Sequence, residues 1–131
     1  MRILHIAFTD EWDQGRAADG GYQVSSRDRT LSDEGFIHAS SAAQVAGVLA
    51  RFYADADPAA LSLLVLDVPA LVDAGSAVRW DEVAGSATPF PHIYGPIGPD
   101  AVVAVLPITG TAGAPVLPDL SGWDVAPLPP R

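Results

Sequence analysis

The order of apolar and polar residues along this chain predicts several short strands. Side chains of residues 2–8 alternate between two faces, with Ile3, His5 and Ala7 on one and Leu4, Ile6 and Phe8 on the other. Residues 61–68 are almost wholly apolar, with Asp67 near the end, which is typical of a central strand buried on both faces. Shorter apolar runs predict three more strands, at residues 35–39, 78–83 and 101–106.

Helical periodicity is clear in one segment. Ser40-Ser41 followed by Gln44 is a capping-box signal, and apolar residues then recur at helical spacing up to about Ala54: Val45, Val48, Leu49 and Phe52. A shorter helix carrying Trp12 is expected after a cap at Thr9 or Asp10, with Gly20-Gly21 ending it. Residues 69–73 suggest one helical turn, and the polar residues 22–34 suggest a loop with one short strand turn.

These elements predict an α+β fold with a mixed or antiparallel sheet and two or three helices, because strands outnumber helices without regular βαβ alternation. The length of 131 residues suits one domain. We place that domain at residues 1–107. Residues 108–131 form a proline- and glycine-rich tail, either loosely ordered or strapped down by Val116, Leu117, Leu120 and Trp123.

Composition narrows the classes of function. The net charge is -9 and all seven basic residues are scattered arginines, so we expect no groove that binds nucleic acid. Binding of a small phosphorylated ligand is not excluded, because it needs only one or two arginines. The absence of cysteine excludes a disulfide scaffold, a thiolate zinc site and a thiol nucleophile. We expect no membrane span and no signal peptide, hence a cytoplasmic protein, either monomeric or dimeric through a strand edge.

The three histidines are the most informative residues, because each lies among apolar, glycine or proline residues. A buried imidazole must find a hydrogen-bond partner or a ligand. His5, His38 and His92 are therefore either separately satisfied core residues or members of one site. Their wide separation in sequence gives only weak support for a metal site, and we predict none.

The segment Phe90-Pro91-His92-Ile93-Tyr94-Gly95-Pro96 is the densest local signal. In an extended backbone Phe90, His92 and Tyr94 point the same way, so the segment either grips a small polar ligand or forms a stiff turn with an aromatic plug. Ser40 either caps the following helix or faces a ligand anion. Asp81 and Glu82, adjacent on a strand, face opposite ways. Either the inward carboxylate binds a ribose hydroxyl or stabilises a cationic transition state, or the two form a solvated pair at a strand end.

Taken in order, these motifs resemble a bacterial family, the domain of unknown function 952. The matching segments cover about residues 3–107: His5, Trp12, Gly21-Tyr22, residues 34–40 with Gln44, Leu63 to Asp67, residues 78–81 and residues 90–96. The resemblance implies a fold like that of ADP-ribosyltransferases, a split α+β sheet with a cleft for a nicotinamide dinucleotide, which makes NAD the cofactor to test. The family itself has no established activity.

Carried over residue by residue, the resemblance implies that His5 orients a ribose and that Tyr22 or Tyr94 offers an aromatic face to a base. Trp12, Ser40, Phe90 and Gly95 complete the expected ligand-binding set. Where the family commonly has glutamate after the aromatic residue, this chain has Asp81 followed by Glu82. The polar loop could also bring Arg27 or Arg29 to a phosphate.

Two hypotheses follow. In the first, the protein is a transferase acting on a nucleotide or a phosphate-bearing substrate, with His5, His38 and His92 binding or exchanging protons and Asp81 or Glu82 as the acid. In the second, it is a small-ligand-binding module that keeps the cleft without the chemistry.

Overall fold

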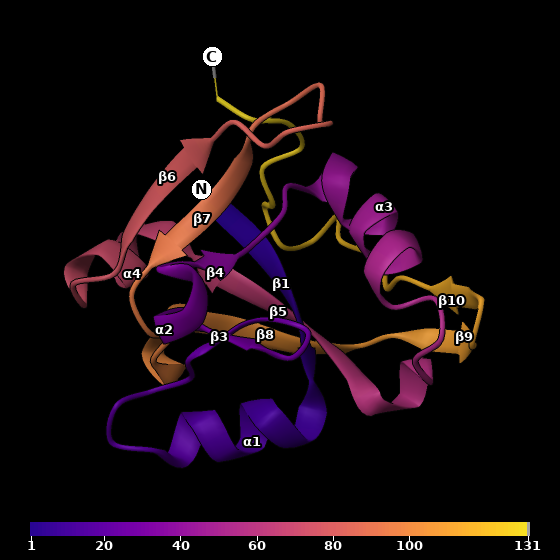
Figure 1. Cartoon of the computed structure of the whole chain (residues 1–131), viewed down its shortest axis with the longest axis horizontal. Helices are drawn as coiled ribbons and strands as arrows, with labels where there is room; N and C mark the ends of the chain where they lie inside the picture. Colours follow the sequence, from indigo (N-terminus) through magenta and orange to yellow (C-terminus); the bar gives the residue numbers. More distant parts are fainter. Residues whose placement is uncertain (131) are drawn as a thin grey trace.

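The computed structural model, which describes residues 1–130, is built on two three-stranded antiparallel sheets (Figure 1). The first sheet has the order β1-β5-β8: β1 (Arg2–Phe8), β5 (Leu61–Asp67) and β8 (Val102–Pro107). The second has the order β4-β7-β6: β4 (Ile37–His38), β7 (Phe90–Tyr94) and β6 (Ala77–Asp81). The α+β class and the antiparallel sheet predicted from the sequence are therefore confirmed.

The two sheets meet at one point on β1. The backbone N–H of Leu4 donates to the carbonyl of Ser40 at 2.9 Å, and the N–H of Ser40 donates to the carbonyl of Leu4 at 2.8 Å. Because Ser40 follows β4 closely, this pair of bonds holds the edge of the second sheet against the edge of the first. His38 and the residues after it are thereby fixed next to β1.

The described residues form four α-helices, where the sequence predicted two or three: α1 (Thr9–Ala17), α2 (Leu31–Glu34), α3 (Ala42–Phe52) and α4 (Val68–Asp73). Short 3-10 helices precede β5 and β8, at Pro58–Ala60 and Pro99–Ala101. Two hairpins complete the fold: β2 (Val24–Ser26) with β3 (Arg29–Thr30), and β9 (Thr109–Thr111) with β10 (Ala114–Val116). No helix within residues 1–130 is long and apolar enough to cross a membrane.

Some helix boundaries differ from the expectation. The helix α1 ends at Ala17, before the glycines. No side chain caps its start, because the N-cap position is occupied by Phe8 and not by Thr9 or Asp10. The Thr9 hydroxyl, within the helix, shares a hydrogen bond of 2.7 Å with the Ser62 hydroxyl.

The predicted cap of α3 is found in part: the N-cap is Ser41 and not Ser40, and the Gln44 side chain accepts from the backbone N–H of Ser41 at 3.0 Å. The Ser41 hydroxyl is buried and has no hydrogen-bond partner within residues 1–130. The loop predicted at residues 22–34 contains the β2–β3 hairpin and α2, whose start is capped by Thr30.

Apolar side chains from alternate positions of β1 and β5 fill two cores. On one face Ile3, Ala7, Leu64 and Leu66 pack with Trp12 and Tyr22; on the other Leu4, Ile6, Leu63 and Val65 pack with Val45 and Leu49 of α3. The segment Leu61–Leu66 is buried throughout. The central position predicted for this strand is therefore correct.

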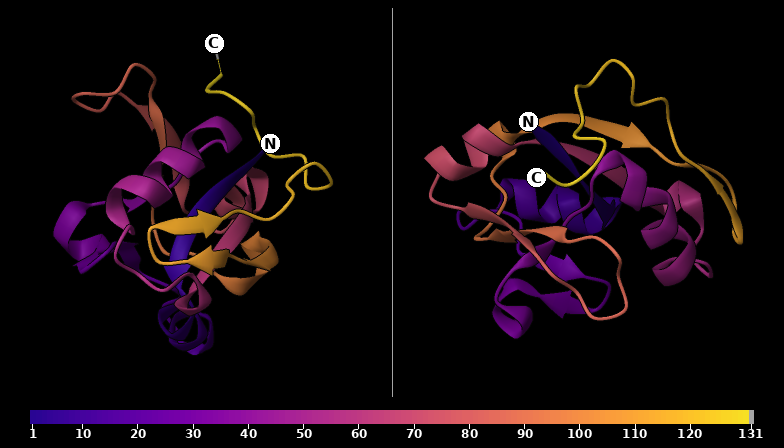
Figure 2. Two further views of the ribbon diagram at one scale, coloured as in Figure 1. Left: turned by 90° about the vertical axis from the view of Figure 1, so that its right-hand side faces the viewer. Right: turned by 90° about the horizontal axis from the view of Figure 1, so that it is seen from above.

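The C-terminal segment runs over β1 towards the start of α3 (Figure 2). Val125 pairs with Arg2 in a parallel bridge, and the N–H of Ala126 donates to the Arg2 carbonyl at 2.9 Å. The carbonyls of Ala126 and Pro127 accept from the N–H groups of Ala42 and Ala43 at 2.8 and 3.1 Å. The tail therefore satisfies two N–H groups that the first turn of a helix leaves without intrahelical partners.

Candidate functional site

A cleft of about 620 Å³ opens between β1, the β2–β3 hairpin, the end of α3 and the loop before β7. Its polar lining comes mainly from the hairpin and β4: His5, Ser25, Ser26, Arg27, Asp28, Arg29, Glu34, His38 and Ser40. Its apolar lining comes mainly from β1 and α3: Leu4, Ile6, Val48, Phe52, Tyr53 and Phe90. Such a volume, with one polar and one apolar wall, suits a small molecule that has both kinds of surface.

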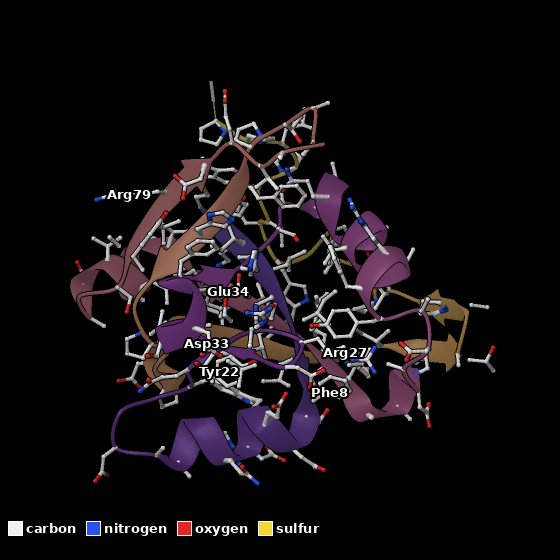
Figure 3. The ribbon with its side chains drawn as sticks, in the orientation of Figure 1. Phe8, Tyr22, Arg27, Asp33, Glu34 and Arg79 are labelled. Carbon is white, nitrogen blue, oxygen red and sulfur yellow. The ribbon has the colours of Figure 1, made fainter. Side chains whose placement is uncertain are left out.

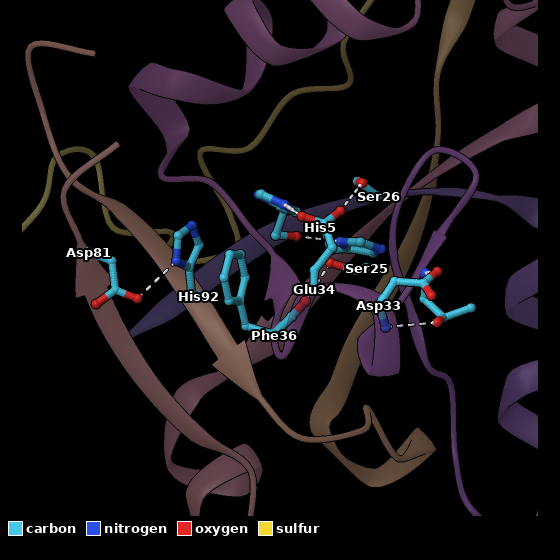
Figure 4. Close-up of polar contacts among 10 residues, drawn as sticks. His5, Ser25, Ser26, Asp33, Glu34, Phe36, Asp81 and His92 are labelled. Carbon is cyan, nitrogen blue, oxygen red and sulfur yellow. Dashed lines mark hydrogen bonds and ion pairs between the residues drawn. The ribbon is translucent and has the colours of Figure 1, made fainter. Parts of the chain in front are cut away.

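Glu34 is the central polar residue of this cleft. Its two carboxylate oxygens have separate partners: the Ser26 hydroxyl donates to Oε1 at 2.7 Å, and Nε2 of His38 lies 3.0 Å from Oε2 (Figure 4). Burial alone would raise the pKa of Glu34, but the hydrogen bonds from His38 and Ser26 outweigh it and hold the pKa below its usual value. Glu34 is therefore a carboxylate at neutral pH.

His5 lies beneath β4 with both ring nitrogens occupied. Its Nδ1 is 2.6 Å from the His38 carbonyl, which can only accept, so Nδ1 carries the proton. Nε2 consequently accepts from the Tyr22 hydroxyl, 2.9 Å away. Burial lowers the pKa of His5 to about 4, so the ring is neutral, and its partners make it a support for β4.

His92 belongs to a second histidine–carboxylate pair. Its Nδ1 lies 2.9 Å from Oδ2 of Asp81, and the Tyr94 hydroxyl donates to the same oxygen. The Tyr94 bond is the main cause of the lowered pKa of Asp81, while burial lowers the pKa of His92 against the effect of Asp81. Nε2 of His92 is buried and has no hydrogen-bond partner within residues 1–130.

The strand register brings these residues to one face of the second sheet. His38 pairs with His92, which pairs with Arg79, so the three side chains form a row across β4, β7 and β6. The rings of His38 and His92 are 5.2 Å apart between centroids. The ring of Phe36 stacks on His92 at 3.9 Å and shields it, as Figure 4 shows.

The remaining predicted residues are divided between cleft and core. Ser40 and Phe90 line the cleft, as the ligand-binding hypothesis requires. Trp12 of α1 and Tyr22 of the segment between α1 and β2 do not line it. Both are buried, with their rings 5.6 Å apart in the first core. The backbone of Tyr22 is held there by a bridge to Ile97.

Gly95 and Glu82 also lie away from the cleft. A Cβ atom on Gly95 would collide with Ser76, so this glycine permits a close approach between two segments of backbone. Glu82 is exposed in the loop after β6 and borders a smaller hollow formed by residues 82–89. Tyr94 is half-buried and bonded to Asp81, beneath the guanidinium of Arg79, which lies 5.2 Å from its ring centre.

Arg27 connects the hairpin to the end of α3 across the cleft. Its guanidinium is 2.5 Å from Asp55 Oδ1 and lies 5.6 and 5.9 Å from the ring centres of Phe8 and Tyr53 (Figure 3). Asp55 raises the pKa of Arg27, and burial raises the pKa of Tyr53 to about 12. Arg29 and Arg51, also at the cleft, make no salt bridge within residues 1–130.

Sequence reasoning missed Glu34 as a site residue, together with Ser26 and Phe36. The available signal was the spacing of Glu34 and His38, four residues apart across Gly35. Gly35 adopts a φ of +84°, a left-handed conformation that glycine favours and that ends α2 here. The chain therefore turns back at this point, and the two side chains meet.

The fold has a solved neighbour of similar length. The structure of protein CC0527 from Caulobacter crescentus aligns with a TM-score of 0.71 and 28% identity, covering 93% of this chain and 96% of that one. A double mutant of CC0527 aligns with a TM-score of 0.70 over the same shares of both chains. No curated protein matches the sequence.

The family comparison covers most of the chain. Residues 6–105 match the model of the family described as "Protein of unknown function (DUF952)", a stretch that includes Glu34, His38, Asp81 and His92. The chain therefore belongs to the DUF952 family.

Proposed function

We propose that the cleft binds a small phosphate-bearing molecule of nucleotide-like character. The observation that carries this proposal is the position of Arg29 and Arg51, neither of which makes a salt bridge within residues 1–130, on one cleft in a protein whose net charge is -9. Arginines that have no carboxylate partner suit phosphate oxygens, because the guanidinium offers parallel N–H donors. The apolar wall, including Phe52 and Phe90, suits the flat, less polar part of such a molecule.

Within this proposal the candidate residues have different roles. His38, Ser40 and Phe90 contact the ligand, while His5 and Glu34 hold His38 in place. Asp81, His92 and Tyr94 form a separate cluster beside the cleft. The proposed domain remains residues 1–107, with residues 108–131 as a strap on it.

A more specific form of this proposal is that the protein is a bacterial relative of the ADP-ribosyltransferases and that its ligand is NAD. The two three-stranded sheets joined at Leu4 and Ser40 support it, as does a histidine on the first strand. The occupied ring nitrogens of His5 speak against that residue orienting a ribose. Asp81 already accepts two hydrogen bonds and Glu82 lies outside the cleft, so binding without ADP-ribosyl transfer is the better supported alternative.

The test is a titration of the protein with ADP, NAD and inorganic pyrophosphate, in buffer with EDTA, observed through the NMR signals of the three histidine rings. We expect saturable shifts of the His38 ring with ADP and smaller shifts of the buried His5 and His92 rings. Arg29→Gln and Arg51→Gln should each weaken binding several-fold. Arg16→Gln on α1, where Arg16 lies 3.5 Å from Asp13, is the matched control and should not change it.

Failure of all three compounds to shift the His38 ring at millimolar concentration would refute the proposal. Binding of ADP but not NAD would retain the phosphate-binding cleft and reject the relation to nicotinamide chemistry.

A further inference from the structure

We propose that Ser26, Glu34 and His38 form a relay that makes His38 the general base of a phosphoester-cleaving centre, an inference that rests on the proposed binding of a phosphate-bearing molecule in the cleft. None of the motifs read from the sequence pointed to this relay. It consists of one hydroxyl, one carboxylate and one imidazole, contributed by β2, α2 and β4.

The carboxylate sets the tautomer of His38. A carboxylate only accepts hydrogen bonds, so Nε2 of a neutral His38, 3.0 Å from Glu34, carries the proton. The lone pair is then on Nδ1, which has no hydrogen-bond partner within residues 1–130. The His38 side chain is 42% exposed and lines the cleft, so this lone pair is accessible to a bound molecule.

The ring is held in place from several sides. The Ser26 hydroxyl fixes the second oxygen of Glu34 at 2.7 Å, and the buried Nδ1–H of His5 fixes the carbonyl of His38 at 2.6 Å. The Ser25 hydroxyl donates to the carbonyl of Phe36, two residues before His38. A catalytic group needs such locked support, because small displacements of a base from its substrate reduce the rate strongly.

His92 and His5 differ from His38 in their access to the cleft. His92 also has a carboxylate partner, but its side chain is only 5% exposed and Phe36 covers one face of its ring. His5 is buried with both nitrogens bonded. Of the three imidazoles, His38 alone combines an ionised partner with access to the cleft, so the other two serve as internal controls.

The proposed step is a hydrolysis without oxidation or reduction. Nδ1 of His38 takes a proton from a water molecule, and the water oxygen forms a bond to the phosphorus of the bound ester. The bond from phosphorus to the leaving oxygen breaks on the side opposite to the attacking water, and the leaving group departs as an anion that takes its proton from the solvent. The imidazolium then releases its own proton to the solvent, which restores the neutral His38. Glu34 stabilises the imidazolium, while Arg29 and Arg51 stabilise the charge on the phosphoryl oxygens.

Two measurements test the proposal. The first is the rate at which diethyl pyrocarbonate modifies each histidine at neutral pH, followed by mass spectrometry of peptides. We expect His38 to react much faster than His5 and His92. Glu34→Gln should slow the reaction of His38, because an amide oxygen accepts from Nε2–H less strongly than a carboxylate does. Ser26→Ala keeps the carboxylate and should give a smaller reduction. Asp10→Asn removes an exposed carboxylate of α1 that does not line the cleft, and it should leave the rate unchanged.

The second measurement is release of p-nitrophenolate from bis(p-nitrophenyl) phosphate in buffer with EDTA. We expect cleavage by the wild-type protein, a slower rate in Glu34→Gln and a loss of roughly 100-fold or more in His38→Ala. Absence of cleavage by the wild-type protein, or equal reactivity of His38 with and without Glu34, would overturn the proposal. Either result leaves the ADP titration intact, so loss of the catalytic proposal is distinguishable from loss of the binding proposal.

Discussion

Hydrogen-bond partners give each of the three histidines a separate role, although all three lie in similar sequence contexts. His5 is enclosed by two protein partners, His38 shares one nitrogen with Glu34 and presents the other to the cleft, and His92 is tied to Asp81 under Phe36. The pattern of apolar neighbours identified these residues as unusual. It could not assign their roles, because the partners Tyr22, Glu34 and Phe36 are brought to them only by the fold.

The neutral state of His5 predicts how stability depends on pH. The pKa of His5 is lowered from 6.5 to about 4, so between these values the unfolded chain binds a proton that the folded chain does not. The free energy of unfolding therefore decreases as the pH falls from 6.5 to about 4, by roughly 3 kcal/mol for His5 alone. The lowered pKa of His92 acts in the same direction.

Urea unfolding at several pH values across this interval measures the effect. In His5→Asn the titrating group is absent, so the loss of stability between pH 6.5 and 4 should be smaller than in the wild-type protein, whatever the absolute stability of the variant. Equal slopes in both proteins would show that His5 is already protonated in the folded state.

At the scale of elements, β1 and β5 were predicted well, whereas the short polar strands and the short buried strand β7, expected as a ligand-gripping segment or a stiff turn, were not. β1 was predicted at the bounds it has, and β5 within one residue. The β2–β3 hairpin and α2 were missed because their polar residues are stabilised by particular hydrogen bonds, such as those between Thr30 and Asp33, and not by an apolar face. Since this same segment supplies Ser26 and Glu34, the part of the cleft that holds His38 in place could not be predicted from the sequence pattern.

The C-terminal strap is an element whose contribution can be measured directly. Deleting residues 123–131 removes the bonds from the N–H groups of Ala42, Ala43 and Ala126, and with them the partners of the first turn of α3. We expect unfolding to become easier by roughly 2–4 kcal/mol, at about 1 kcal/mol for each hydrogen bond, plus the lost packing of Trp123. Thermal unfolding and hydrogen exchange at Ala42 and Ala43 would report it.

A shorter deletion supplies the control. Removing residues 128–131 leaves these three hydrogen bonds in place, so both the melting temperature and the exchange at the start of α3 should stay close to those of the full chain. If the two deletions behave alike, the strap does not stabilise α3.

For the whole molecule, the uneven distribution of charge predicts two opposite responses to salt. The net charge of -9 makes the folded chain repel itself, and salt screens that repulsion. The melting temperature should therefore rise between about 20 and 200 mM NaCl, by roughly 3–6 °C if the gain is ~1 kcal/mol. Binding of ADP should weaken over the same range, because Arg29 and Arg51 attract the phosphates through charges that salt also screens. Differential scanning calorimetry and binding titrations on the same samples measure both. If the affinity for ADP does not change with salt, the apolar wall and not the arginines provides the binding energy. The cleft would then not be specific for a phosphate group.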